Sequence, residues 1–300
     1  MVCLRSGAKS PRARLAGTNP TGLLDFRGRT GNKNRTALSP VGTMSSQPVS
    51  VTAGLVVIGD EILSGRTKDR NIGTVADFCT DLGIDLREVR VVADDRPAIV
   101  EAVQALSVRY TYVFTSGGIG PTHDDITAES VAAAFDVPVD IHPEARRILE
   151  ERFGTADLTP GRLLMARVPR GGSLIVNSVS GAPGFVIGNV HVMAGVPLVL
   201  EAMLEDLAPR LRGGRKLSSI AIDCCVGESM VAADLGAIQS AYPDVKIGSY
   251  PQLGRPPVFT QLVLRAADTD LLAAAAAEVQ ALVDRLHVEN NIDLMGKTSA

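Results

Sequence analysis

Strand and helix patterns alternate along the chain from Ala53 onward, and this alternation limits the fold more than any other feature. Apolar runs of strand length cover Gly54–Ile58, Leu86–Val92 and Tyr110–Thr115, and amphipathic helical patterns separate them. Strands that alternate with helices pair in parallel and are covered by helices on both faces. The sequence therefore predicts a three-layer α/β sandwich with a mostly parallel sheet.

The pattern divides the chain into two folded segments. The α/β pattern fills residues 51–211, ending with a helix from Pro197 to Leu211. A polar linker, Arg212 to Arg215, contains two glycines. After it, the order strand, helix, strand, strand, helix predicts a small α+β domain over residues 216–288. Residues 289–300 lack a period, and we expect a flexible tail there.

The first 50 residues differ in composition from the rest. They contain eight Lys/Arg residues and one acid within a chain of net charge −3, so the remainder carries −10. Their apolar residues have no helical or strand period, and we predict a disordered leader. An Arg-rich leader is also typical of a transit peptide, whereas Met44 offers a plain alternative start. We favour a mis-assigned start over a targeting signal.

Composition also excludes several classes of partner. Charged residues interrupt every apolar stretch before about 18 residues, so we expect no membrane span. The acidic body offers no broad basic surface, which argues against nucleic-acid binding. The four cysteines form no CxxC pair, and we expect reduced thiols in a cytoplasmic protein.

A glycine-rich loop after the third predicted strand has the composition of an anion site. Gly117, Gly118 and Gly120 allow backbone N–H groups to turn toward one point, and the next helix adds its positive end. Pro121 and Thr122 follow, then two carboxylates, Asp124 and Asp125, which supply the oxygens that Mg²⁺ prefers. The loop thus predicts a phosphate bridged by a divalent metal, with Asp124 and Asp125 as the metal-ligating and candidate catalytic residues.

Other readings of these residues remain open. The glycines could form only a tight turn, and Asp124 and Asp125 could cap the helix that starts near Thr127. A dinucleotide site of the Rossmann type is disfavoured, because the third glycine is missing and the loop follows the third strand. Asp60 and Glu61 end the first strand and could line the same crevice or face solvent. Asn71 could reach the crevice or simply open its helix.

Several motifs together resemble the molybdopterin-binding domain of the MoaB and Mog type, as found at the front of CinA proteins. They are Gly59–Gly65 (GDEILSG), Asn71, Gly117–Thr127 (GGIGPTHDDIT), Asn177, Gly181–Phe185 (GAPGF) and Gly195–Pro197 (GVP). The resemblance covers about residues 53–211. The small domain is similar to the segment that follows this domain in CinA.

The resemblance implies roles that the pattern alone does not give. It implies that Gly117, Gly118 and Gly120 hold phosphate and that Asp125 works with Mg²⁺ in adenylyl transfer, while an aspartate at Asp124 is typical of CinA-like chains. Some CinA-type domains hydrolyse ADP-ribose with a metal, so pyrophosphate cleavage is a candidate reaction. A second ligand wall is implied at Asn177, Pro183, Gly184, Gly195 and Pro197. Relatives form dimers or trimers, and we expect a homo-oligomer.

Two features depart from the CinA pattern. Ala194 stands where a proline precedes Gly195 in CinA-like chains, so one ring of the second wall is lost. No counterpart of the CinA amidase region follows the small domain, so deamidation is not predicted. The sequence thus favours a protein that binds a pterin or adenine nucleotide with a divalent metal. Nucleotidyl transfer or pyrophosphate hydrolysis and a non-catalytic binding or scaffolding role both remain open.

Overall fold

The computed structural model describes residues 50–292. The N-terminal part of these residues forms a six-stranded sheet. The strand order is β2-β1-β3-β8-β7-β6. The first four strands run parallel, whereas β7 and β6 are antiparallel additions at one edge. Their bounds are β1 Thr52–Ile58, β2 Asp85–Val92, β3 Tyr112–Ser116, β6 Ser173–Ile175, β7 Gly184–Ile187 and β8 Val190–Met193. The predicted mostly parallel sheet is confirmed.

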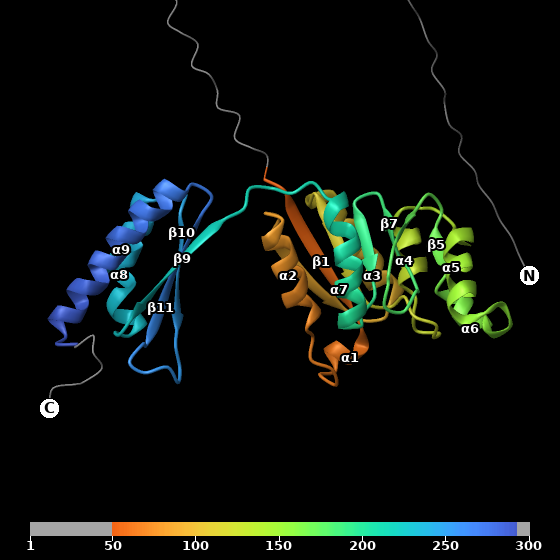
Figure 1. Cartoon of the computed structure of the whole chain (residues 1–300), viewed down its shortest axis with the longest axis horizontal. Coiled ribbons are helices and arrows are strands. Elements are labelled where there is room, and N and C mark those ends of the chain that lie inside the picture. Colours follow the sequence, from red (N-terminus) through yellow and green to blue (C-terminus); the bar gives the residue numbers. More distant parts are fainter. Residues whose placement is uncertain (1–49, 293–300) are drawn as a thin grey trace, which may run out of the picture. The chain divides into compact units, whose positions relative to one another are not determined.

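Helices cover both faces of this sheet, as Figure 1 shows. Helices α2 (Asn71–Asp81) and α7 (Pro197–Leu207) pack on the face that contains Leu55 and Val57. Helices α3 (Arg96–Arg109) and α4 (Thr127–Ala134) pack on the other, which contains Val56 and Ile58. Adjacent residues of a strand face opposite sides of the sheet, and both sides of β1 are covered by helices. Nearly all of its residues are therefore buried, and β1 is a continuous apolar run. This arrangement is the three-layer sandwich that the sequence predicts.

The structure adds short elements that the sequence patterns did not indicate. Helix α1 (Asp60–Leu63) follows β1 directly. Between α4 and β6 the chain forms a small excursion with its own core of Ala145, Leu149 and Ala166. It consists of β4 Val139–Ile141, α5 Pro143–Phe153, the 3-10 turn η1 Thr155–Asp157, α6 Pro160–Leu164 and β5 Arg167–Pro169. Only α5 within it was predicted, because the other elements are too short to show a period.

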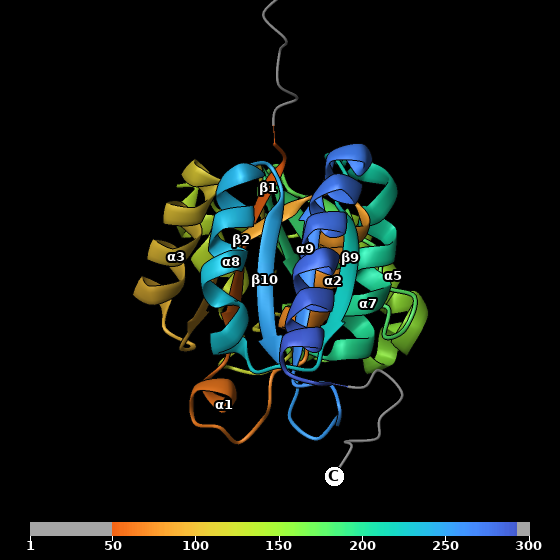
Figure 2. The same ribbon diagram turned by 90° about the vertical axis from the view of Figure 1, so that its left-hand side faces the viewer.

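The C-terminal part of the described chain has a separate antiparallel sheet of order β10-β11-β9. Its strands are β9 Ser218–Cys224, β10 Lys246–Pro251 and β11 Thr260–Ala266. Helices α8 (Glu228–Ala241) and α9 (Thr269–Glu289) lie side by side over one face of this sheet (Figure 2) and share its apolar core. The strand and helix order is the predicted one.

Helix α9 extends beyond Leu286, the last residue of the predicted helix, to Glu289. His287 is buried, and its Nε2 accepts a hydrogen bond from the backbone N–H of Cys225 at 2.9 Å. Ile292 packs against the same core. The apolar period of the sequence is too weak to predict this last turn of α9, which tertiary contacts stabilise. The remaining tail residues, 293–300, and the predicted leader, residues 1–49 with Met44, lie outside the described residues.

No helix within residues 50–292 is long and apolar enough to cross a membrane. Cys79 and Cys224 are buried, Cys225 is partly buried, and all three are free thiols. Burial raises the pKa of the Cys79 thiol to about 12, so this side chain stays protonated and serves as a small apolar group.

Candidate functional site

The predicted site residues gather at one edge of the large sheet. The parallel strands β1, β2, β3 and β8 all end at this edge, which places the segments after them side by side. Strand β7 is antiparallel to β8, so it begins here at Gly184. In an open parallel sheet the carboxyl ends of the strands form the usual ligand crevice. The motifs spread from Asp60 to Pro197 therefore meet in the fold.

The glycine loop has a backbone shape that only glycine allows at two positions. Gly117 and Gly118 have φ angles of 110° and 68°. A Cβ on Gly117 would lie 2.2 Å from the carbonyl oxygen of Ile58, and one on Gly118 would lie 2.2 Å from Oγ1 of Thr127. Both positions thus combine left-handed backbone with close packing, and neither tolerates a side chain.

Thr127, the first residue of α4, fixes the loop from the opposite side. Its buried hydroxyl donates to the carbonyl oxygen of Gly117 at 3.0 Å, and its N–H donates to the carbonyl oxygen of Gly118 at 3.0 Å. The N–H groups of Gly118, Ile119 and Gly120 have no hydrogen-bond acceptor in the part of the chain that the structure describes. Three consecutive free donors beside a helix start provide the hydrogen-bonding capacity that an anion needs.

Asp125 closes the loop rather than capping α4. Its Oδ2 accepts hydrogen bonds from the N–H of Thr122 at 2.8 Å and from the Thr122 hydroxyl at 2.5 Å. The residue before α4 is Ile126, and no side chain caps that helix. The alternative reading of the two aspartates as helix caps is therefore wrong for Asp125. Asp124 lies beside it on the surface, with its side chain 61% exposed.

A fifth acidic residue, Asp94, joins the four predicted carboxylates. It follows β2, and its Oδ2 accepts a hydrogen bond from the N–H of Asp60 at 2.9 Å. Burial raises the pKa of Asp94, and the negative charges of Asp60, Glu61 and Asp124 raise it further. Asp60, Glu61 and Asp124, which follow β1 and β3, therefore lie within electrostatic reach of Asp94 after β2. Asp94 was not among the predicted site residues, although an acid two residues after a predicted strand was the available signal.

The donor chemistry of this acidic group fits a divalent cation. Within residues 50–292, however, no three His, Cys, Asp or Glu side chains converge closely enough to hold a metal ion alone. Mg²⁺ usually keeps several waters and uses one or two carboxylates together with substrate phosphates, so it does not require a preformed triad. The residues therefore fit a metal that arrives with a phosphorylated ligand.

Asn71 connects two of the strand ends. Its side chain is buried, and its Nδ2 donates to Oγ of Ser116 and to the carbonyl oxygen of Gly195, both at 2.7 Å. Gly195 in turn packs on the glycine loop, because an added Cβ would lie 3.2 Å from Cα of Gly117. Asn71 thus holds the turn before α7 against the end of β3, which is a positioning task.

The predicted second wall lies at the same edge. The side chain of Asn177 donates to Ser180 Oγ and to the carbonyl oxygen of Ala182, and it accepts from the N–H groups of Val179 and Ser180. Its hydrogen-bonding capacity is filled, so it shapes the turn, and direct ligand contact would require breaking these bonds. Pro183 and Gly184 lead into β7, and Pro197 begins α7.

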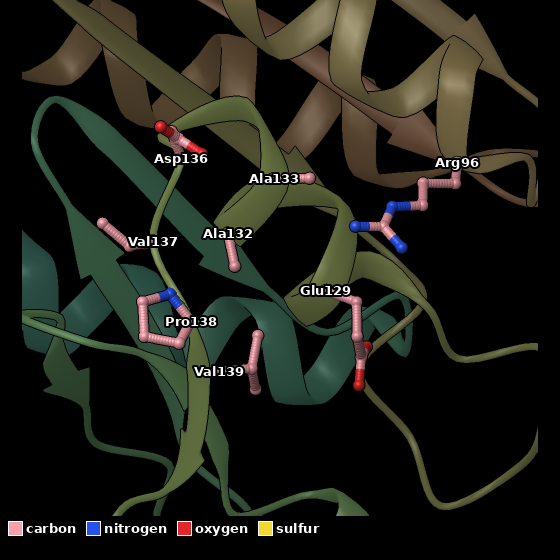
Figure 3. A pocket seen from close by; sticks show the side chains of 8 residues that line it. All are labelled: Arg96, Glu129, Ala132, Ala133, Asp136, Val137, Pro138 and Val139. Atoms are coloured by element: carbon pink, nitrogen blue, oxygen red, sulfur yellow. The ribbon is translucent and has the colours of Figure 1, made fainter.

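A pocket of about 590 Å³ lies elsewhere, beside α4. Figure 3 shows Arg96 and Glu129 at one end of it, and Asp136 with apolar side chains from α4, the following turn and the start of β4 at the other. None of the predicted site residues lines this pocket. The convergence of strand ends, and not this hollow, therefore marks the candidate site.

The profile of the family described as probable molybdopterin binding domain matches residues 54–213. The chain belongs to this family. The match spans the six-stranded sheet and includes every predicted site residue. A second profile, described as the middle domain of FAD synthase, matches residues 216–291. From the sequence, this second part was expected only to be similar to the segment that follows the domain in CinA.

Relatives of this molybdopterin-binding family member include CinA-like proteins. One from Anaeromyxobacter sp. (strain Fw109-5) is 41% identical over 161 residues, which cover 51% of this chain and 39% of the relative. An Archaeoglobus fulgidus protein is 32% identical over 200 residues, covering 67% of this chain and 86% of the relative. This chain thus spans less than half of the CinA-like relative.

Two further comparisons cover the fold and the C-terminal part. The crystal structure of CinA from Thermoplasma acidophilum is 36% identical and aligns with a TM-score of 0.51, covering 54% of this chain and 98% of that chain. A probable FAD synthase from Caenorhabditis elegans is 30% identical over 263 residues, covering 79% of this chain and 50% of the relative. The second alignment is longer than the molybdopterin-binding domain alone.

Proposed function

We propose that this protein binds a pterin or adenine nucleotide that carries a phosphate or pyrophosphate, together with a divalent cation such as Mg²⁺. The observation that carries the proposal is the placement of four carboxylates, Asp94 among them, beside a loop with free N–H donors. Carboxylates repel a bare phosphate. A cation between them removes that repulsion, while the N–H groups hold the oxygens that the cation leaves free.

The anion is held by the glycine loop in this proposal. Gly118 and Gly120 supply backbone donors, Gly117 sets the turn, and Pro121 with Thr122 keeps the far side of the loop in place. Thr127 supports it through its two hydrogen bonds to the carbonyl oxygens of Gly117 and Gly118. Because these donors are already oriented, binding needs little rearrangement of the loop.

The cation is held by the acidic group. Asp94 and Asp124 are the candidates for direct contact, and Asp60 and Glu61 add negative charge beside Asp94. Asp125 holds Thr122 through one oxygen, Oδ2, which leaves Oδ1 available. A bound divalent cation would supply charge neutralisation on the phosphate oxygens. The protein side chains orient the phosphate relative to this charge.

The second wall faces the ring system of the ligand. The turn that Asn177 shapes, Pro183 and Gly184, and the turn from Gly195 to Pro197 offer backbone and small side chains rather than charges. Such a surface accommodates a flat pterin, adenine or flavin ring. One relative is named a probable FAD synthase, and FAD joins two nucleotides through a pyrophosphate. FAD therefore belongs among the candidate ligands beside ADP-ribose and pterins.

With such a ligand bound, metal-dependent cleavage of the pyrophosphate or nucleotidyl transfer is the reaction that the site favours, by positioning and charge neutralisation. A non-catalytic binding module is the second candidate. It is favoured by the finding that no three metal-ligating side chains converge within residues 50–292. The predicted cytoplasmic location and homo-oligomeric state stay predictions.

A thermal-shift screen of the purified protein tests the proposal. The probes are AMP, ADP-ribose, FAD and a pterin phosphate, each with Mg²⁺ and with chelator. A ligand that binds the folded state raises the melting temperature by mass action. We expect a shift that requires Mg²⁺ with at least one pyrophosphate compound and a smaller one with AMP. Absence of any Mg²⁺-dependent shift across the panel would contradict the proposal.

A further inference from the structure

Arg167 lies on β5, in the excursion between α4 and β6, and contacts the glycine loop. It is not part of the motifs that carry the family resemblance. Its Nη2 donates to the backbone carbonyl oxygen of Asp125 at 3.1 Å. Its Nε donates to the carbonyl oxygen of Leu164 at 3.1 Å, and its Nη1 pairs with the carboxylate of Glu129 on α4. One guanidinium thus joins the loop, the helix that follows the loop, and the end of α6.

The pair is partly buried, so water screens its charges less than it would on the surface. The side chains of Arg167 and Glu129 are 22% and 30% exposed. Oε1 of Glu129 accepts the hydrogen bond from Nη1 of Arg167, whereas in the described part of the chain Oε2 is buried without a partner. Arg167 is therefore the positive group that balances the charge of this carboxylate. A planar guanidinium fixes several acceptors at once, and a flexible ammonium group cannot reproduce that geometry.

A second contact of the excursion independently bears on the loop. Gly161 in α6 lies against Pro121, since a Cβ on Gly161 would lie 3.2 Å from the carbonyl oxygen of Pro121. The excursion therefore contacts the loop at its middle through Gly161 and at its end through Arg167. Thr122 follows Pro121 at the first contact and donates to the carboxylate of Asp125 at the second, which closes the loop between them.

We propose that Arg167 is a positioning residue: by holding the Asp125 carbonyl against Glu129, it fixes the loop in its anion-binding shape and so sets the affinity for phosphorylated ligands. The effect on affinity rests on the proposed function, whereas the effect on the loop does not. Arg167 touches no reacting atom in this proposal. It acts through the backbone of Asp125, and thereby on the carboxylate that holds Thr122.

Three variants separate this role from general stabilisation. Arg167→Lys keeps the charge beside Glu129 but cannot reach three acceptors. The double variant Glu129→Met with Arg167→Met removes the ion pair without leaving a buried charge unpaired, and such replacements usually preserve folding. Arg170→Met is the matched control, because Arg170 follows β5 directly, pairs with Asp140 of β4 with both side chains exposed, and makes no hydrogen bond to the loop among the described residues.

The first measurement is hydrogen exchange of residues 117–126 in the ligand-free protein. We expect exchange there to rise by about tenfold in both Arg167 variants and to stay unchanged in Arg170→Met. The second is calorimetric titration of ADP-ribose with Mg²⁺, where the dissociation constant should rise about fivefold to tenfold in the Arg167 variants only.

Unchanged loop exchange in both Arg167 variants would overturn the proposal. So would faster loop exchange with an unaltered dissociation constant, because the residue would then serve stability alone. If wild type binds no ADP-ribose, FAD or pterin, the proposed function fails, and exchange of the loop still decides whether Arg167 holds it.

Discussion

The backbone N–H of Asp60 donates to the carboxylate of Asp94 at 2.9 Å, which joins the ends of β1 and β2 where negative charge accumulates. This bond stabilises the ionised form of Asp94, yet burial and the neighbouring charges of Asp60, Glu61 and Asp124 outweigh it and raise the pKa. Without a bound cation, these crowded negative charges should lower the stability of the folded protein at neutral pH. The effect of this acidic group on stability can therefore be measured.

Asp94→Asn should stabilise the ligand-free protein at pH 7. The folded-state pKa is raised above the unfolded value, so ionisation of Asp94 costs stability as the pH rises through this window. Asn keeps an oxygen for the N–H of Asp60 and removes the charge. We expect a melting temperature higher by about 1–3 °C at pH 7, with the difference shrinking as the pH falls toward the ordinary aspartate pKa.

Mg²⁺ provides the complementary arm of that experiment. It should raise the melting temperature of wild type by relieving the repulsion, and raise that of Asp94→Asn less. Thermal unfolding at several pH values with and without Mg²⁺ measures both effects. A variant that is less stable than wild type at pH 7, with an equal response to Mg²⁺, would mean that Asp94 contributes structure and not a cation site.

Asp125→Asn should separate charge from loop closure. The asparagine oxygen can accept both hydrogen bonds from Thr122, so the loop and the melting temperature should change little. Loss of the negative charge should weaken Mg²⁺-dependent binding of the best ligand about tenfold, or ~1.4 kcal/mol. Calorimetric titration of wild type and variant, with Mg²⁺ and with chelator, measures this. Equal affinities in all four titrations would exclude Asp125 from the cation site.

Gly118→Ala should disrupt the loop from within. A residue with a side chain at φ 68° costs about 1–2 kcal/mol, and here the Cβ would also meet Thr127 Oγ1. We expect lower stability and a loss of Mg²⁺-dependent ligand binding. Gly73→Ala is the control, because this helical glycine has open space around it and alanine should stabilise α2 by up to about 1 kcal/mol. Chemical denaturation gives both values, and unaltered binding by Gly118→Ala would place the ligand elsewhere.

Limited trypsin digestion should cut the linker at Arg215 and Lys216 before Arg212. The N–H of Arg212 donates to the hydroxyl of Tyr112 at 2.9 Å, and that of Gly214 donates to the carbonyl oxygen of Leu82 at 3.0 Å. Residues 215–217 are exposed and irregular. Proteases need locally extended chain, so cleavage within residues 50–292 should start there. Mass spectrometry of the first fragments identifies the site, and a first cut inside α7 or β9 would contradict the prediction.

The sequence alone determined most of the strands and helices and the position of the glycine loop between β3 and α4. Apolar periodicity is local, so it marked the strands of both large sheets and most helices. It failed for α1, β4, η1, α6 and β5, which are too short to carry a period. The glycines at 117 and 118 were also readable from sequence, because a left-handed turn restricts the residue type at the position itself.

Only the tertiary structure decided which distant residues meet. Asp94 joins Asp60 because β2 pairs with β1, and Arg167 reaches Asp125 because the excursion folds back beside α4. The structure also made Asp125 a partner of Thr122 instead of a helix cap, and filled the hydrogen bonds of Asn177 within its own turn. Strand order and side-chain partners depend on contacts between segments far apart in the chain, and local composition does not specify such contacts.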